Sequence, residues 1–150
     1  MTDAAQTPHE LAKQLQDALP KTYEAIDAAM KARLGMSPMD EKMRHDAGRT
    51  KDMLRDVVDL IIHSQNLQSI EELPLRVSDY LRDFASRRLT VISAMPSGEE
   101  KWRKEQSFKE LFTDTKLGFM IYAEQLGIRS QMSEALRTLP DLSKGDARET

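Results

Sequence analysis

Cysteine is absent from this chain of 150 residues. Its absence excludes disulfide bonds, thiolate catalysis, iron–sulfur clusters and zinc sites built on cysteine. Aromatic residues are also scarce, with one Trp, three Tyr and four Phe, and this supply is poor for a β-sandwich or a β-barrel. The sequence therefore predicts a helical protein whose core consists mainly of aliphatic side chains, alanine and methionine.

Long apolar runs are missing as well. No stretch approaches the roughly 20 apolar residues that span a bilayer, and residues 1–6 lack a basic segment followed by an apolar run. We therefore expect a cytoplasmic protein that does not contact a membrane. A secreted effector without a signal sequence and a virion component have the same composition, and these two alternatives stay open.

The chain carries no excess of positive charge, since its formal net charge is -3 at pH 7. It therefore has no overall attraction for nucleic acid or anionic lipid. Its length is typical of one domain that buries about two thirds of its unfolded surface without a disulfide or a metal. We predict a single helical domain over residues 1–150, with residues 1–6 and 141–150 as flexible tails.

What the sequence does contain is a repeated signal for the start of a helix. Three segments place a hydroxyl side chain three residues before a carboxylate, and apolar residues follow at helical spacing. The hydroxyl accepts a hydrogen bond from a free amide of the first turn, and the carboxylate is favoured at the positive end of the helix dipole. The three segments are Thr7–Glu10, Ser37–Asp40 and Ser97–Glu100.

Apolar spacing, proline and glycine then predict the helices. The first runs from Pro8 to Leu34 and is kinked or split at Pro20, because proline lacks the amide hydrogen that a helix needs. Gly35 is a candidate C-terminal cap of this helix, and Gly127 of the fourth. The other predicted helices span residues 38–66, 74–95, 98–126 and 130–139. The fold class that we predict is all-α, an elongated and mostly antiparallel four-helix bundle with a short fifth C-terminal helix.

The same spacing predicts which faces point inward. In helix 74–95 the inward stripe includes Val91 and Ile92, and Arg88 lies within it. In helix 98–126, residues 116–126 are apolar nearly all round, which is typical of a helix at the centre of a bundle or in an oligomer interface. Gly118 lies in this segment, and we expect another backbone to approach it closely. The inward residues of helix 38–66 are Met43, Ala47, Leu54, Val57, Val58 and Ile61.

One side of helix 38–66 carries histidine and aspartate and is the first candidate site. These residue types bind metal ions, and helical spacing brings them to the same side of the helix. The residues are His45, Asp52, Asp56, Asp59 and His63. A solvated face with pairs of opposite charge is the alternative interpretation of the same pattern.

The neighbouring residues His45 and Asp46 extend this candidate. They are similar to the His-Asp dyad of helical metal-dependent phosphohydrolases, which implies a divalent-metal site completed by another histidine and a further aspartate. The candidates for these positions are His9, Asp79, Asp83 and Asp114. The first alternative function is therefore a metal-dependent helical enzyme of the phosphohydrolase type that uses His45, Asp46, Asp52, Asp56, Asp59 and His63.

Basic residues gather around the turn between helices 74–95 and 98–126. They are Arg82, Arg87, Arg88, Lys101, Arg103 and Lys104, and their charge is diluted by Glu99, Glu100 and Glu105. Arginine and lysine on helices near a bend are typical contacts for nucleic-acid phosphates. A helical DNA-binding regulator is therefore the second alternative function. In the other interpretation, Arg88 pairs with Asp83 or Asp114, or lays its stem over the core.

Trp102 lies outside the apolar face of its helix, and a tryptophan in that position is an interface anchor or a lid over the end of the bundle. No nucleotide-binding loop, nucleophile elbow or zinc motif occurs in the sequence, and no cofactor is expected. We therefore predict a non-enzymatic protein-interaction module, such as an adaptor, a regulator, a secretion chaperone or an assembly subunit. It is expected to form a homodimer or another homo-oligomer through helices 74–95 and 98–126. The residues predicted to contact its partners are Trp102, Phe108, Phe112, Met120 and Arg88.

Overall fold

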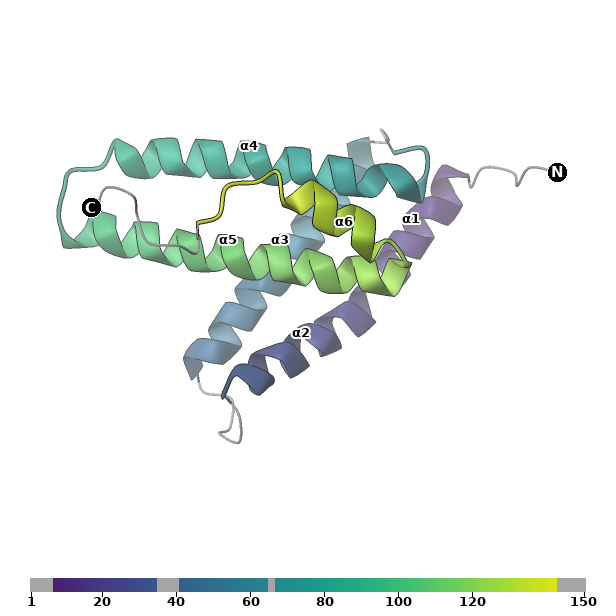
Figure 1. Cartoon of the computed structure of the whole chain (residues 1–150), viewed down its shortest axis with the longest axis horizontal. Coiled ribbons are helices and arrows are strands. Elements are labelled where there is room, and N and C mark those ends of the chain that lie inside the picture. Colours follow the sequence, from purple (N-terminus) through teal and green to yellow (C-terminus); the bar gives the residue numbers. More distant parts are fainter. Residues whose placement is uncertain (1–6, 35–40, 65–66, 143–150) are drawn as a thin grey trace.

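The computed structural model describes residues 7–34, 41–64 and 67–142, and helices account for most of them (Figure 1). The elements are α1 (Pro8–Asp17), α2 (Leu19–Leu34), α3 (Glu41–Ser64), the 3₁₀ turn η1 (Ile70–Glu72), α4 (Leu73–Ser93), α5 (Glu99–Leu126) and α6 (Arg129–Leu136). No β-strand occurs in these three stretches of the chain. The predicted all-α class is therefore confirmed.

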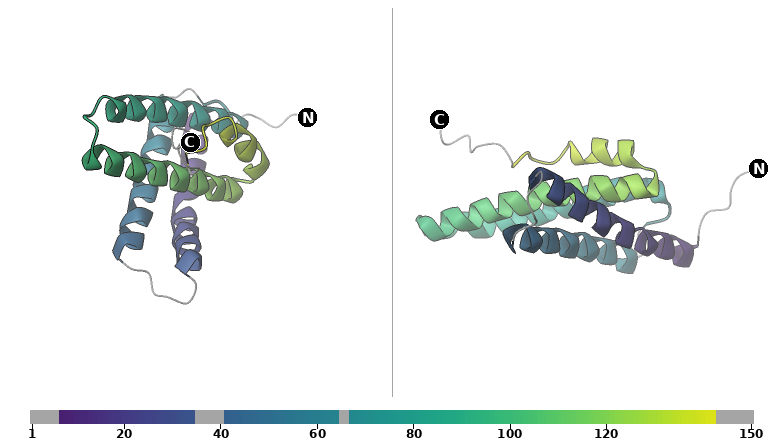
Figure 2. Two further views of the ribbon diagram at one scale, coloured as in Figure 1. Left: turned by 60° about the vertical axis from the view of Figure 1, so that its left-hand side comes forward. Right: turned by 90° about the horizontal axis from the view of Figure 1, so that it is seen from below.

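Two helices, α4 and α5, form a long antiparallel pair that runs along the long axis of the molecule (Figure 1). The short helix α6 packs on both of them from one side, and α1, α2 and α3 lie on the other side (Figure 2, right). α5 contacts α2, α3, α4 and α6, and its residues Phe119 and Tyr122 are completely buried. Residues 116–126 therefore form the centre of the fold, which is one of the two roles predicted for them.

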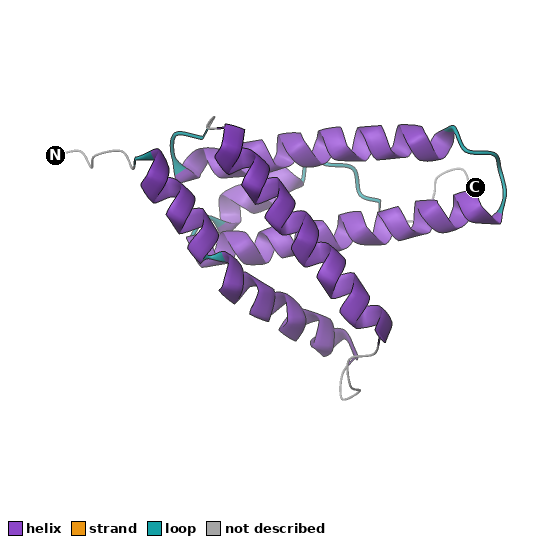
Figure 3. Ribbon diagram, turned by 180° about the vertical axis from the view of Figure 1, so that it is seen from behind, coloured by secondary structure: helices purple, strands orange, loops and turns teal. Residues whose placement is uncertain are grey.

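The expected four-helix bundle arrangement is not confirmed. α2 and α3 pack against each other, but this pair crosses the α4–α5 pair obliquely instead of lying along it (Figures 1 and 3). A bundle with nearly parallel axes needs an apolar seam that repeats every 3.5 residues over several heptads, and this chain does not sustain one. Shorter apolar stripes pack through ridges and grooves at steeper crossing angles.

The first helix starts and breaks where the sequence predicts. The amide of Glu10 donates a hydrogen bond of 3.1 Å to Oγ1 of Thr7, and the amide of Thr7 donates one of 2.9 Å to Oε1 of Glu10. The split predicted at Pro20 is confirmed, because α1 and α2 are separated at Ala18. At this break the hydroxyl of Thr22 donates a hydrogen bond of 2.7 Å to the carbonyl oxygen of Ala18.

The ends of α5 depend on two glycines. The N-cap of α5 is Gly98, with a φ of 149°, and no side chain caps this end. The capping role predicted for Ser97 is therefore wrong, because the chain enters the helix through a backbone conformation that favours glycine. Gly127 ends α5 in the left-handed conformation, with a φ of 76°, as predicted. The predicted cap at Gly35 and the predicted helix start at Ser37 lie outside the described residues.

The inward face predicted for α3 is confirmed, since Ala47, Leu54, Val57, Val58 and Ile61 are all buried. The side chain of Met43 lies outside the described part of the chain. In α4 the prediction is right for Ile92, which is 4% exposed, and wrong for Val91, which is 61% exposed. The reason is that the end of α4 extends past α2, α3 and α6, so these helices do not cover its sides (Figure 1).

The close contact predicted at Gly118 exists, but side chains make it instead of a backbone. A Cβ atom at Gly118 would lie 3.2 Å from Cγ2 of Thr50 and 3.5 Å from Cδ1 of Ile26. Thr50 belongs to α3 and Ile26 to α2. The missing side chain of Gly118 therefore lets α5 pack closely against both helices at the point where the two helix pairs cross.

Candidate functional site

The turn of the α4–α5 hairpin projects beyond α2, α3 and α6 (Figure 1). We call residues 88–111 the projecting end, which includes this turn and the base of the hairpin, where Ser107 and Glu110 contact α3. Two large apolar side chains are exposed there, Val91 at 61% and Trp102 at 60%. The hairpin is held at its turn, because Nζ of Lys101 donates a hydrogen bond of 3.3 Å to the carbonyl oxygen of Ser93 in the last turn of α4. The projecting end is therefore a hairpin with a hydrogen bond near its turn and with exposed apolar side chains.

A groove of about 610 Å³ lies between the projecting end and α3. The aromatic ring of Phe108 supports its floor, with a centroid 5.6 Å from the ring centroid of Phe84 and 5.7 Å from that of Phe112. Such a cluster of tilted rings gives a rigid apolar base. The residues that line the groove are Arg49, Arg88, Val91, Ile92, Met95, Arg103, Lys104, Ser107, Phe108 and Leu111.

The polar part of the groove has one sign of charge. Four of the lining residues are cationic, and no aspartate or glutamate is among the described residues that line it. Arg49 reaches from α3 to α5, where its Nη1 donates a hydrogen bond of 3.0 Å to Oγ of Ser107. The guanidinium carbon of Arg88 lies 5.7 Å from the ring centroid of Phe84, in the range of a cation–π contact. The groove is therefore positively charged in a chain whose net charge is -3.

The two other cations of the groove come from the first part of α5. Nη2 of Arg103 lies 2.9 Å from Oε2 of Glu99, and both side chains are mostly exposed, so water screens this pair strongly. Lys104 forms no ion pair with another described residue. The described carboxylates therefore compete only weakly with a negatively charged ligand for binding to Arg103 and Lys104.

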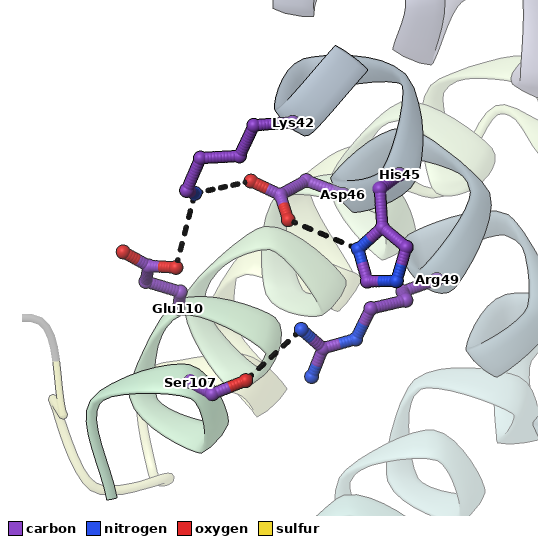
Figure 4. Close-up of polar contacts among 6 residues, drawn as sticks. All are labelled: Lys42, His45, Asp46, Arg49, Ser107 and Glu110. Atoms are coloured by element: carbon purple, nitrogen blue, oxygen red, sulfur yellow. Dashed lines mark hydrogen bonds and ion pairs between the residues drawn. The ribbon is translucent and has the colours of Figure 1, made fainter. Parts of the chain in front are cut away.

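Two carboxylates near Arg49, those of Asp46 and Glu110, contact Lys42 (Figure 4). Nζ of Lys42 lies 2.8 Å from Oδ2 of Asp46 and 3.4 Å from Oε1 of Glu110. The hydrogen bond to Asp46 is the main reason why the pKa of Lys42 is raised above its ordinary value. Lys42 thus links α3 to α5 and offsets one of the two negative charges of Asp46 and Glu110.

The five residues predicted to contact a partner differ in their exposure and in their position relative to the groove. Phe108 and Phe112 are 4% and 1% exposed, and they support the groove from within the core without offering surface to a partner. Met120 is half-buried in the central part of α5. Trp102 is exposed but does not line the groove, and Arg88 does line it. Of the five residues, Arg88 and Phe108 are therefore the two that line the groove.

Sequence reasoning missed several residues of the groove. Arg49 and Ser107 belong to different helices and are 58 positions apart, and no local pattern marks them as neighbours. The helical spacing places Val91 in the inward stripe of its helix. The signal that was available is the basic cluster, because Arg88, Arg103 and Lys104 were all predicted to lie near the turn between the two helices.

The metal-ligating side chains predicted on α3 are spread along the helix. His45 and His63 are 18 residues apart, which corresponds to about 27 Å of helix. Nδ1 of His63 lies 2.7 Å from the carbonyl oxygen of Asp59, and Nη2 of Arg55 lies 3.4 Å from Oδ1 of Asp52. Arg55 also approaches Asp56, at 3.7 Å. Within residues 7–34, 41–64 and 67–142, no group of three or more metal-ligating residues is placed to hold one ion.

The dyad predicted at His45 and Asp46 has the following geometry. Nδ1 of His45 lies 3.8 Å from Oδ1 of Asp46, and the side chain of His45 is mostly exposed. Two of the aspartates proposed to complete the site form ion pairs with arginine: Asp79 lies 3.3 Å from Arg82, and Asp83 lies 2.6 Å from Arg87. The third, Asp114, is buried in α5. His9 is exposed near the start of α1. The dyad therefore stands without the further ligands that the resemblance implies.

Two of the three arginines proposed to bind DNA form contacts within the chain. Arg82 contacts Asp79 and also donates a hydrogen bond of 2.8 Å to Oγ1 of Thr138 in the segment after α6. Arg87 pairs with Asp83, so Asp83 is not the partner of Arg88. Of the three arginines, Arg88 alone lines the groove.

Comparison with protein-family models, with curated proteins and with solved structures finds no match for this chain. None of the helices in the described stretches combines the length and the apolar character needed to cross a bilayer. Because a helical fold serves many unrelated activities, the function has to be argued from the groove and its surroundings.

Proposed function

We propose that this protein is a non-enzymatic protein-interaction module that binds its partners through the projecting end. The observation that carries the proposal is the groove, which combines an apolar floor with a cationic rim and lies between α3 and the end of the α4–α5 hairpin. An apolar centre with a polar rim is the usual composition of a protein interface. A role as an adaptor, a regulator, a secretion chaperone or an assembly subunit uses a surface of this kind, and a cytoplasmic location belongs to the same proposal.

Self-association is part of this proposal. Trp102 is 60% exposed on α5 and lies outside the groove, so it offers a second apolar contact on the projecting end. Tryptophan side chains contribute a large share of the binding energy at interfaces because they bury a large apolar area with few rotatable bonds. We therefore propose a homodimer or another homo-oligomer that forms through α4 and α5, with Trp102 as its anchor.

Sedimentation velocity of the purified protein from about 1 to 200 µM tests the self-association. The wild type is expected to form a larger species as its concentration rises, and Trp102→Ser is expected to remain monomeric at these concentrations. Leu75→Ser is the matched control, because Leu75 is 61% exposed near the opposite end of α4. A wild type that stays monomeric throughout, or an equal effect of both substitutions, would contradict this part of the proposal.

A further inference from the structure

The groove has the dimensions of a short helical segment. Its α5 side runs from Arg103 to Leu111, and the facing side consists of Arg88, Val91 and Ile92 in α4 and of Met95 just after that helix. At the rise of an α-helix the α5 side is about 12 Å long, which corresponds to about two helical turns. Two turns of an amphipathic helix present about three apolar side chains on one face, at spacings of three or four residues.

The floor of the groove suits apolar side chains better than nucleic-acid bases. Val91, Met95 and Leu111 supply aliphatic and thioether surface, and a methionine adapts its shape to different partners. The lining residues include one aromatic ring, that of Phe108, which is only 4% exposed. Single-stranded nucleic acids bind largely by stacking bases on exposed rings, and the groove offers no such platform among its described residues.

The positive charge of the groove favours a partner with negative charge. Arg49, Arg88, Arg103 and Lys104 line it, and no aspartate or glutamate is among its described lining residues. A second copy of this chain would bring the same four cations against them if two grooves met face to face, because such an interface pairs identical surfaces. Repulsion between like charges opposes that arrangement. Charge complementarity therefore favours an acidic partner over a second copy in the groove.

We infer that the groove binds an acidic amphipathic helix of a partner protein. The apolar face of that helix lies on the floor around Val91 and Leu111, and its glutamates or aspartates lie beside Arg88, Lys104 and Arg49. The inference rests on the proposed function and adds the chemistry of the partner to it. Trp102 stays free in this arrangement because it does not line the groove, so self-association and helix binding are separate events.

Fluorescence anisotropy with synthetic peptides tests the inference. The probe is a labelled peptide of about 14 residues with leucine at positions i, i+3, i+7 and i+10 and glutamate on both flanks of that face. One control peptide carries lysine in place of every glutamate, and another carries glutamine in place of every leucine. A labelled oligodeoxythymidine is the nucleic-acid control. The acidic peptide is expected to bind most tightly of the four, and to bind more weakly as the salt concentration rises.

Two pairs of protein variants then locate the binding site. Arg88→Glu reverses a charge in the groove, and Arg87→Glu makes the same change at the neighbouring residue, which does not line it. Val91→Ser removes apolar floor, and Leu75→Ser removes an equally exposed side chain far from the groove. We expect Arg88→Glu and Val91→Ser each to weaken binding of the acidic peptide about tenfold, while both controls change it less than twofold.

The outcomes separate this inference from the proposed function. Equal binding of the acidic and lysine peptides, tighter binding of the oligodeoxythymidine, or equal losses in both members of a variant pair overturns the inference. If no peptide binds while the wild type still self-associates through Trp102, the inference fails and the proposed function stands. If neither event occurs, both fail together. Circular dichroism of every variant shows whether its helices remain folded.

Discussion

The hydroxyl of Tyr122 donates a hydrogen bond of 2.6 Å to the backbone carbonyl oxygen of Leu15, which lies 107 residues earlier in the chain. Leu15 belongs to the last turn of α1, where helix carbonyls lose their partners within the helix. The side chain of Tyr122 is completely buried, and this burial raises the pKa of its hydroxyl. The bond therefore ties the C-terminal part of α5 to the helix break before Pro20.

Replacement of this tyrosine tests the bond. Tyr122→Phe is expected to lower the free energy of unfolding by about 1–2 kcal/mol, because the buried carbonyl of Leu15 loses its donor while the packing of the ring is kept. Tyr80→Phe, at a half-buried position of α4, is the control, with an expected change below about 0.5 kcal/mol. Urea denaturation of both variants gives these values, and equal losses would contradict the role of the hydrogen bond.

The same side chain predicts a dependence on alkaline pH. Burial, with a smaller contribution from the charge of Tyr23, holds the pKa of Tyr122 above its ordinary value of 10.0. A tyrosine with a raised pKa in the folded state contributes its full stability below the unfolded pKa and loses it as the pH rises further. Above pH 10 the wild type should therefore lose about 1.4 kcal/mol per pH unit more than Tyr122→Phe does. Urea denaturation at several alkaline pH values measures this difference, and parallel curves would contradict it.

The two glycines within α3 and α5 predict opposite effects of alanine. At Gly48 no atom lies within 4 Å of the added Cβ, so Gly48→Ala should stabilise the protein by about 0.5–1 kcal/mol through helix propensity. At Gly118 the Cβ would lie 3.2 Å from Cγ2 of Thr50, a branched side chain with little freedom to move. Gly118→Ala should therefore destabilise the protein, by about 1–2 kcal/mol.

Removal of the methyl group that crowds Gly118 provides a check on this explanation. Thr50→Ser deletes Cγ2 and keeps the hydroxyl, so the cost of Gly118→Ala should be smaller in the Thr50→Ser background than in the wild type. Thermal unfolding of the four proteins of this double-mutant cycle measures the coupling. Additive effects of the two substitutions would show that Thr50 does not restrict the site.

Substitutions at two adjacent residues of α4 test which of them belongs to the hydrophobic core. Ile92 is 4% exposed and Val91 is 61% exposed. Ile92→Ala should lower the free energy of unfolding by about 2–4 kcal/mol, because it leaves a cavity under the groove, whereas Val91→Ala should change it by less than about 0.5 kcal/mol. Denaturation with urea measures both changes. A large loss at Val91 would mean that a surface covers it, as the helical spacing predicted.

Much of the local structure could be predicted because the signals act within one helical turn. Thr7 and Glu10 form their predicted capping box, Pro20 splits the first helix, and Gly127 ends the fourth predicted helix. Each of these features depends on hydrogen bonds and backbone angles among residues at most four positions apart. The exception is Ser97, where the conformation of the adjacent Gly98 replaces the expected side-chain cap.

The candidate site was predicted less well, since it depends on contacts between distant segments. The interaction hypothesis names Phe108 and Phe112 as partner contacts, and periodicity places Val91 in the core, but the structure buries the first two and exposes the third. Periodicity shows which face of a helix is apolar. It does not show how far along that face another helix extends to cover it, and this length decides whether an apolar residue belongs to the core or to the surface.

The helical class, the approximate positions of the helices and the basic residues near the α4–α5 turn can all be predicted from the amino-acid sequence. The oblique crossing of two helix pairs, the extension of the α4–α5 turn beyond the other helices and the contact of Arg49 with Ser107 in a cationic groove emerge from the folded chain. Helix formation depends on neighbours along the chain, and local patterns therefore predict it. Crossing angles and grooves depend on the packing of side chains from residues far apart in the sequence.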